Sequence, residues 1–211
     1  MRRERGVTRR AILIFVKYPE PGLVKTRLAA TLGAECAAEI YRRLVAEVFL
    51  RLPEDEDVIV CFDPAERREE IERWLNGIAT GKRLHFLPQC VGDLGARLTD
   101  AFAETFARGF QQVAAIGTDC VEIDAAIFAE TWTTLDTHDV AIGPSEDGGY
   151  YLIALTAPSP AIFEKIPWSS ASVLAETLAR AASENLRIHL LPILHDVDTE
   201  EDWRRAEQRL R

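Results

Sequence analysis

Short, uninterrupted apolar runs separated by helix-like segments constrain the fold of this chain more than any other sequence feature. Residues 11–16 read Ala-Ile-Leu-Ile-Phe-Val and end at a Pro-Glu-Pro-Gly turn. A strand buried on both faces has this continuous apolar character, which is typical of parallel sheets. Further strands are predicted at residues 58–62, 84–87, 113–116, 140–142, 150–155 and 187–191.

The segments between these runs have the apolar spacing of helices. From Ala37 to Phe49, apolar side chains recur every three or four residues, which places them on one face of a helix. Further helices are predicted at residues 64–75, 94–106, 124–136 and 172–178 and from residue 199 onward. Ser172 is expected to cap its helix, with Glu176 near the position of a capping box. This alternation predicts a three-layer α/β/α sandwich around a mostly parallel sheet.

The length and charge of the chain limit the classes of function. A chain of 211 residues suits one domain, so we expect a single domain at residues 11–211 after a flexible basic tail at residues 1–10. The net charge of -9 argues against sequence-independent binding to nucleic acid, which requires a basic surface. We therefore expect small-molecule partners and no nucleic acid.

The cysteines and the apolar segments predict a cytoplasmic location. The four cysteines are scattered and form no CxxC pair, which argues against a disulfide framework and a zinc site. The run at residues 11–16 is too short for the apolar core of an export signal or for a membrane span. No membrane insertion is therefore expected, and the oligomeric state is left open.

Ligands of such sheets bind beyond the carboxyl ends of the strands, so the loops there are the candidate sites. The first of these loops reads Lys-Tyr-Pro-Glu-Pro-Gly-Leu-Val-Lys-Thr-Arg-Leu from residue 17. Gly22 would let the backbone approach an anion, Thr26 is expected to cap a helix, and Lys25 and Arg27 would bind phosphate. The loop lacks the leading glycine of a Walker A motif, and a solvated basic loop is the alternative.

The loop after the third predicted strand is a second candidate for nucleotide binding. Gly92 and Gly95 would let a flat base lie on the backbone, with Arg97 free for phosphate or for a partner carboxylate. The alternative is that Asp93 only caps the following helix.

Aspartates after two further strands are candidate metal ligands. Asp119 ends the run at residues 113–116, where Mg²⁺ or Mn²⁺ would find a hard oxygen ligand. A helix cap or an Asx turn is the alternative for Asp119. Alternation sends Asp196 and Asp198 to the same side of the chain, so one is expected to complete the metal site while the other caps the final helix. Cys120 is expected to be buried, and His195 to be a surface group.

The segment Ser-Glu-Asp-Gly-Gly-Tyr at residues 145–150 is the most unusual in the chain. Its two glycines would bring the backbone close to a substrate, with Asp147 as a general base for an acceptor hydroxyl or as a ligand of sugar hydroxyls. The alternative is a turn whose acids face water. Trp168 is expected either in an acceptor wall or in the core.

Together these motifs resemble a bacterial family of glycosyltransferase-A-type proteins. The segments that carry the resemblance are FVKYPEPGLVKTRL, GDLGARL, IGTDC, GPSEDGGYYLIAL, IPWSSASVLAETLARA and HDVDTEEDW. Members are often described as nucleotide-diphospho-sugar transferases or arsenosugar-biosynthesis glycosyltransferases. The wider superfamily includes nucleotidyltransferases similar to phospholactate guanylyltransferase and the molybdenum-cofactor guanylyltransferase.

The resemblance implies a role for each matching position. It implies a nucleotide phosphate site at Gly22, Lys25 and Arg27, a base-facing loop at residues 92–95, a metal ligand at Asp119, an acceptor-side carboxylate at Asp147 and a second acid within residues 196–198. One departure stands out, because Val121-Glu122 follows the Asp-Cys pair where the family usually has proline.

These motifs predict a transferase that uses a nucleotide-activated donor with Mg²⁺ or Mn²⁺. In the favoured hypothesis, a sugar passes from a nucleotide-diphospho-sugar to a small acceptor: Lys25 and Arg27 neutralise the diphosphate, and Asp147 accepts the proton of the acceptor. Nucleotidyl transfer from a nucleoside triphosphate to a phosphorylated acceptor is the first alternative. A nucleotide-binding protein without turnover is the second.

Overall fold

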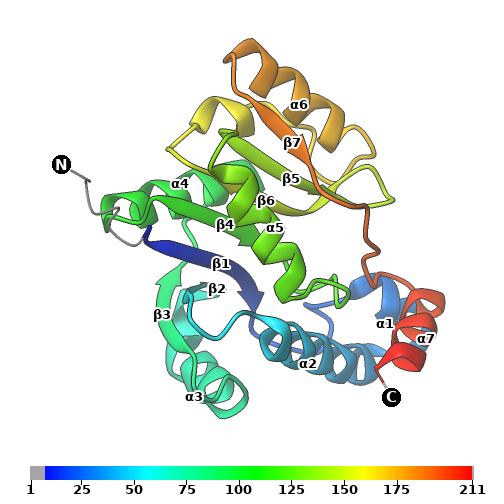
Figure 1. Cartoon of the computed structure of the whole chain (residues 1–211). Helices are drawn as coiled ribbons and strands as arrows, with labels where there is room; N and C mark the ends of the chain where they lie inside the picture. Colours follow the sequence, from blue (N-terminus) through cyan, green and yellow to red (C-terminus); the bar gives the residue numbers. More distant parts are fainter. Residues whose placement is uncertain (1–7, 211) are drawn as a thin grey trace.

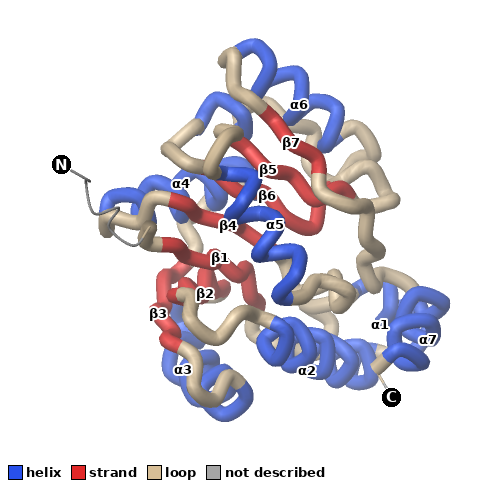
Figure 2. The backbone as a smooth tube through the Cα atoms, viewed as in Figure 1, coloured by secondary structure: helices blue, strands red, loops and turns tan. Residues whose placement is uncertain are grey.

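One seven-stranded sheet runs through the computed structural model, which describes residues 8–210 (Figures 1 and 2). The strands are β1 (Arg10–Lys17), β2 (Asp57–Asp63), β3 (Arg83–Pro88), β4 (Gln112–Ile116), β5 (Val140–Pro144), β6 (Tyr150–Leu155) and β7 (Ile188–Leu190). Their order is β3-β2-β1-β4-β6-β5-β7. Only β6 runs antiparallel to its neighbours, so the sheet is mostly parallel, as predicted.

Helices cover both faces of the sheet and form the outer layers. One face carries α1 (Thr26–Leu32), α2 (Ala34–Arg51), α3 (Arg68–Ile78), α5 (Ala125–Leu135) and α7 (Glu200–Arg209); the other carries α4 (Leu94–Ala107), η2 (Pro160–Phe163) and α6 (Val173–Ser183). A short 3-10 turn, η1 (Ala65–Arg67), precedes α3. The three-layer α/β/α class is therefore confirmed.

Alternation along the central strand β1 divides the hydrophobic core in two. Ile12 and Ile14 pack with the helices of the α2 face, whereas Ala11 and Leu13 pack with those of the α4 face. All four side chains are fully buried. A strand covered on both sides has no polar face, which explains the continuous apolar run.

Several helix ends differ from the predicted ones. Lys25 is the N-cap of α1 and Thr26 is its first residue, so Thr26 does not cap this helix. Ser172 is the N-cap of α6 but its side chain makes no capping hydrogen bond. The capping box lies instead at α7, between Thr199 and Asp202. The capping role predicted for Asp196 or Asp198 is therefore wrong, because the Thr199 hydroxyl takes it.

The predicted basic tail is only partly within the described residues. Residues 1–7 lie outside them, whereas Arg9 and Arg10 are held by the fold. The Arg9 guanidinium lies 4.4 Å from the centroid of the Phe110 ring. Arg10 is the first residue of β1, and its Nε donates to Gln112. Arg9 and Arg10, at the end of the predicted tail, thus belong to the fold.

Within residues 8–210, no helix is long and apolar enough to cross a membrane. The four cysteines are free thiols, and Cys120 is buried as predicted. Burial raises the pKa of the Cys120 thiol to about 12, so it is protonated and unreactive near neutral pH.

Candidate active site

A cleft of about 810 Å³ opens at the carboxyl ends of β1 and β4, beside the turn that joins β5 to β6. Its walls include Lys17, residues 23–27, residues 117–119, Asp147, residues 149–150, residues 168–171, Asp196 and Asp198. These segments are far apart in sequence and meet where parallel α/β sheets bind their ligands. Lys25, Asp119 and Asp147 therefore share one cleft.

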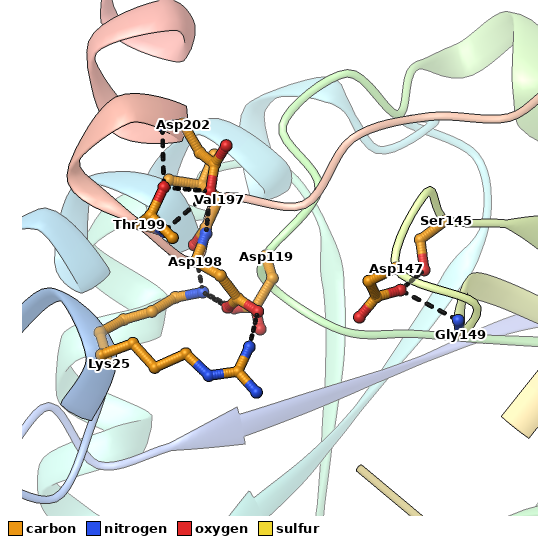
Figure 3. Close-up of polar contacts among 10 residues, drawn as sticks. Lys25, Asp119, Ser145, Asp147, Gly149, Val197, Asp198, Thr199 and Asp202 are labelled. Atoms are coloured by element: carbon orange, nitrogen blue, oxygen red, sulfur yellow. Dashed lines mark hydrogen bonds and ion pairs between the residues drawn. The ribbon is translucent and has the colours of Figure 1, made fainter. Parts of the chain in front are cut away.

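Lys25 is the centre of the charged wall of this cleft. Its Nζ lies 2.8 Å from Asp119 Oδ1 and 3.2 Å from Asp198 Oδ1, and it donates to the carbonyl of Val197 at 2.5 Å (Figure 3). Only 5% of the Lys25 side chain is exposed. Burial lowers the pKa of Lys25, but the two carboxylates outweigh burial and hold it above its usual value. The three N–H groups of the ammonium thus face three oxygen acceptors.

The backbone around Lys25 fixes this arrangement. Lys25 has a left-handed backbone conformation, with φ of 46°, at the turn before α1. The Val197 amide donates to the Asp119 carbonyl at 2.8 Å, which joins the loop after β4 to the segment before α7. Asp202 accepts the backbone N–H of Thr199 at 2.8 Å and that of Asp198 at 3.3 Å. The start of α7 therefore positions Asp198.

Asp196 lies in the same cleft with little solvent. Burial is the main cause that raises its pKa, and the nearby carboxylates of Asp119 and Asp147 add to the effect, so the value rises to about 7. Lys25 acts in the opposite direction and offsets only part of the rise. The described lining of the cleft thus contains more carboxylate groups than cationic groups.

Asp147 stands apart from the Lys25 group, on the other side of the cleft (Figure 3). Its Oδ1 accepts the Ser145 hydroxyl at 2.6 Å and the Gly149 amide at 2.9 Å. Its second oxygen projects away from both donors (Figure 3). Gly148 makes this turn possible, because it has φ of +87° and an added Cβ would lie 2.1 Å from the Ala171 carbonyl oxygen.

A chain of side-chain contacts supports the Asp147 turn from outside the cleft. His195 Nδ1 lies 3.0 Å from Glu122 and its Nε2 lies 3.0 Å from Glu146. Glu122 also pairs with Arg209 of α7. Glu146 therefore points toward His195 and away from the cleft. His195, predicted as a surface group, is exposed and links two loops.

The cations of the first loop differ in how accessible they are to a ligand in the cleft. The Arg27 side chain is 69% exposed and lies 2.8 Å from Asp198 Oδ2. Lys17 lines the cleft and is exposed. Gly22 has φ of +85°, as a tight turn requires, but is not among the residues that line the cleft. The backbone of Gly22 thus shapes the loop that carries Lys25 and Arg27.

The loop at residues 92–97 is engaged within the protein. Asp93 caps α4 by accepting the Ala96 amide at 2.9 Å. Arg97 donates to Gln89 at 2.9 Å and lies 3.4 Å from Asp63. An added Cβ on Gly95 would lie 2.5 Å from the Phe163 carbonyl oxygen, so Gly95 serves close packing.

Of this loop, only Leu94 lines the cleft; Gly92, Asp93, Gly95 and Arg97 do not. The alternative interpretation of Asp93 as a helix cap therefore describes the observed contact, and the base-binding role remains a prediction.

Two aromatic residues of the cleft were not identified as site residues from the sequence. Tyr41 belongs to the apolar face of α2, yet its hydroxyl accepts the Lys17 amide at 2.9 Å and the residue lines the cleft. Tyr150 begins β6 beside the Asp147 turn. Their helical and strand spacing indicates core positions, so no local signal separates them from ordinary core residues.

The acids of the cleft fit a divalent ion that is shared with a phosphate. No group of three or more His, Cys, Asp or Glu residues within residues 8–210 is arranged to hold a metal ion. Mg²⁺ commonly takes only one or two carboxylates and completes its shell with phosphate oxygens and water. Asp119 and Asp198, 2.8 and 3.2 Å from the same Lys25 nitrogen, are the pair of carboxylates that such an ion would require, and Asp196 lines the same cleft.

Comparison with known proteins supports a transferase fold. A model of the family described as "Uncharacterized protein conserved in bacteria (DUF2064)" matches residues 50–170. A candidate nucleotide-diphospho-sugar transferase from Desulfovibrio desulfuricans G20 is 36% identical, with a TM-score of 0.81 over 90% of this chain and 82% of that one. No curated protein matches the chain.

More distant structures share the fold alone. 4-Diphosphocytidyl-2C-methyl-D-erythritol synthase from Anaerococcus prevotii DSM 20548 is 11% identical, with a TM-score of 0.60 over 96% of this chain and 98% of that one. The manganese complex of Rv0371c from Mycobacterium tuberculosis H37Rv is 13% identical, with a TM-score of 0.52 over 94% and 97%. The family match and the 36% identical relative show that the chain belongs to the DUF2064 family, with the fold of nucleotide-diphospho-sugar transferases.

Proposed function

We propose that this protein is a metal-dependent transferase that moves a sugar from a nucleotide-diphospho-sugar to a small acceptor. The observation that carries the proposal is the cleft itself, in which Asp119 and Asp198 line one side and Asp147 lines the other (Figure 3). Arg27 contacts Asp198 and lines the same cleft. The 36% identical relative, a candidate nucleotide-diphospho-sugar transferase, supports the donor class.

The donor diphosphate belongs on the charged side of the cleft. Arg27 and Lys17 are exposed there and can donate to phosphate oxygens, whereas the Lys25 ammonium already faces three acceptors. Lys25 holds Asp119 and Asp198 together and offsets part of their charge. The catalytic role of Lys25 is thus to organise the acids, with Arg27 as the direct phosphate ligand.

Asp119 and Asp198 would hold Mg²⁺ or Mn²⁺, with Asp196 as the third acid of the cleft. A bound divalent ion supplies charge stabilisation for the departing diphosphate. The manganese complex of the fold neighbour Rv0371c gives this choice of metal indirect support.

In this proposal Asp147 serves the acceptor. Two hydrogen bonds to its Oδ1 fix the direction of the carboxylate and leave its Oδ2 to accept the proton of an acceptor hydroxyl. Water exclusion by Trp168 and Tyr150 on the same side would strengthen this interaction.

Nucleotidyl transfer is the second candidate because a cytidylyltransferase fold is also among the neighbours. A phosphorylated acceptor is already an anion and requires no general base. Asp147→Asn separates the two reactions. Sugar transfer should fall by about 100-fold or more in kcat, as removal of a general base commonly does, whereas nucleotidyl transfer should be little affected. Full turnover of a sugar donor by the Asn variant would contradict the role of Asp147.

The donor class is tested by the melting temperature. Nucleoside triphosphates and nucleotide sugars are screened with and without Mn²⁺, because a ligand that binds only the folded state raises the melting temperature. We expect a nucleotide sugar to give the largest shift, and Asp119→Ala to remove its Mn²⁺-dependent part. Lys82→Ala, outside the cleft, is the control variant. Equal Mn²⁺-dependent shifts of the melting temperature in the wild type and in Asp119→Ala would contradict the metal assignment. Nucleotide binding without turnover of any acceptor tested would favour a non-catalytic nucleotide-binding protein.

A further inference from the structure

The side of the cleft that holds Asp147 has a different chemistry from the side that holds Lys25. Tyr150 follows the Asp147 turn directly, and the Leu174 amide donates to the Gly148 carbonyl at 2.9 Å. An added Cβ on Gly148 would collide with the backbone of Ala171. The turn and the segment at residues 168–173 are therefore packed together as one wall.

Two aromatic rings dominate this wall. The centroids of the Tyr150 and Trp168 rings lie 6.5 Å apart with an interplanar angle of 80°. Both residues line the cleft, yet the Tyr150 hydroxyl and the Trp168 Nε1 are buried atoms. Trp168 Nε1 faces Gly95 of α4, where an added Cβ would lie 3.0 Å from it. These two side chains therefore present carbon atoms to the cleft.

Small and hydroxyl side chains complete the wall. Ser169, Ser170 and Ala171 line the cleft next to the rings, and Ser170 and Ser172 share a hydrogen bond of 3.0 Å between their hydroxyls. Hydroxyl groups both donate and accept hydrogen bonds, so they match the hydroxyls of an uncharged ligand.

The cations with assigned partners lie on the opposite side. Among the described residues that line the cleft, the cationic ones are Lys17, Lys25 and Arg27. Lys25 contacts Asp119 and Asp198, and Arg27 contacts Asp198, whereas Lys17 is the last residue of β1. An anionic group beside Tyr150 would meet the carboxylate of Asp147, and two like charges at short range repel each other.

We propose that this wall is the acceptor subsite and that it takes an uncharged, hydroxyl-bearing molecule with a planar or apolar face. The face packs against the Tyr150 and Trp168 pair, stacked on one ring and bordered by the other, and a hydroxyl reaches Asp147. This inference rests on the proposed sugar transfer and specifies its acceptor class, because it excludes phosphorylated and carboxylated acceptors.

The test compares two probes that differ by one phosphate. Phenyl β-D-glucoside and phenyl β-D-glucoside 6-phosphate are titrated by saturation-transfer NMR in the presence of Mg²⁺ and the nucleoside diphosphate that most raises the melting temperature. We expect the neutral probe to bind at least about tenfold more tightly than its phosphate. Trp168→Ala should weaken the neutral probe about tenfold and Trp168→Phe by less than about threefold, since the phenyl ring retains an aromatic face.

A second variant, designed to gain binding of the phosphorylated probe, makes the test independent of any effect that Trp168→Ala has on folding. Ser170 is exposed, so Ser170→Lys should leave the fold intact and strengthen binding of the phosphorylated probe. Leu190→Ala, a truncation of an exposed apolar side chain outside the cleft, is the control and should change neither probe.

The outcomes separate the two levels of the proposal. If no nucleotide raises the melting temperature, the proposed function fails. If a nucleotide binds, the donor site stands, and any of three results overturns the acceptor subsite. The first is that the phosphorylated probe binds as tightly as the neutral one, and the second is that the neutral probe does not bind. The third is that neither Trp168→Ala nor Ser170→Lys changes the binding of the probes.

Discussion

At the scale of single residues, the glycines of α4 and α3 show how packing decides the effect of one methyl group. Gly95 lies at the start of α4 against the segment that carries Trp168, and an added Cβ would lie 2.5 Å from the Phe163 carbonyl oxygen. Gly77 lies within α3, and apart from its chain neighbours and the adjacent helix backbone no heavy atom lies within 4 Å of the same position. A sequence pattern would treat the two positions alike, since both are helical.

We predict opposite effects for alanine at these two positions. Gly95→Ala should lower the free energy of unfolding by about 1–3 kcal/mol, because backbone must move to relieve the overlap. Gly77→Ala should raise it by about 0.5–1 kcal/mol, because alanine has the higher helix propensity and meets no obstacle. Urea denaturation measures both. A neutral Gly95→Ala would show that α4 and the Phe163 segment are not in close contact.

At the scale of elements, the ion pairs of His195 connect the Asp147 turn to the start of α7. The turn at residues 145–149 joins β5 to β6, whereas His195 precedes α7, and Glu122 lies between β4 and α5. These three segments hold the acids of the cleft. Glu122, at the departure from the expected proline, thus contributes a carboxylate that ties His195 to α7 through Arg209.

We expect removal of this link to loosen the Asp147 turn. In His195→Ala, amide hydrogen exchange at residues 146–149 should accelerate by roughly threefold, because an exposed ion pair contributes on the order of 0.5–1 kcal/mol. His189→Ala is the matched control, since His189 has similar exposure and lies in β7, 3.8 Å from Glu130 of α5. Unchanged exchange in His195→Ala would mean that Ser145 and Gly149 hold the turn without help.

At the scale of the whole molecule, the edge strand β7 is fastened by Asp139 and Arg187. Arg187 donates to Asp139 from its backbone N–H at 2.9 Å and from its guanidinium at 2.9 and 3.0 Å. The side-chain hydrogen bonds from Arg187, followed by the one from its backbone, lower the pKa of Asp139 to about 2. A carboxylate with a depressed pKa stabilises the folded state wherever it is ionised.

The downward shift of the Asp139 pKa determines how the free energy of unfolding depends on pH. The contribution of Asp139 is fully present above its unfolded pKa of about 4 and is lost as the pH falls through about 2. Asp139→Asn should therefore be less stable than the wild type by about 1 kcal/mol at pH 7, because the pair is solvent-exposed, and the difference should shrink below pH 4. Urea denaturation at pH 7 and at pH 2.5 measures it. A constant difference across this range would contradict the ionic origin of the effect.

The strands, the layer arrangement and the family follow from the sequence by itself. Burial on both faces leaves a local trace in the central parallel strands, so residues 11–16 and 113–116 are recognisable without knowledge of their neighbours. Loops at the carboxyl ends of such strands must meet, which is why Lys25, Asp119 and Asp147 could be assigned to one cleft.

Only the tertiary structure decided what these side chains contact. Lys25 bonds to Asp119 and Asp198 rather than standing free, and Arg97 is engaged by Gln89. Tyr150 and Trp168 expose carbon to the cleft and bury their polar atoms. Such contacts join residues up to 173 positions apart, and their distances depend on the packing of whole elements, which leaves no periodic signal in the chain.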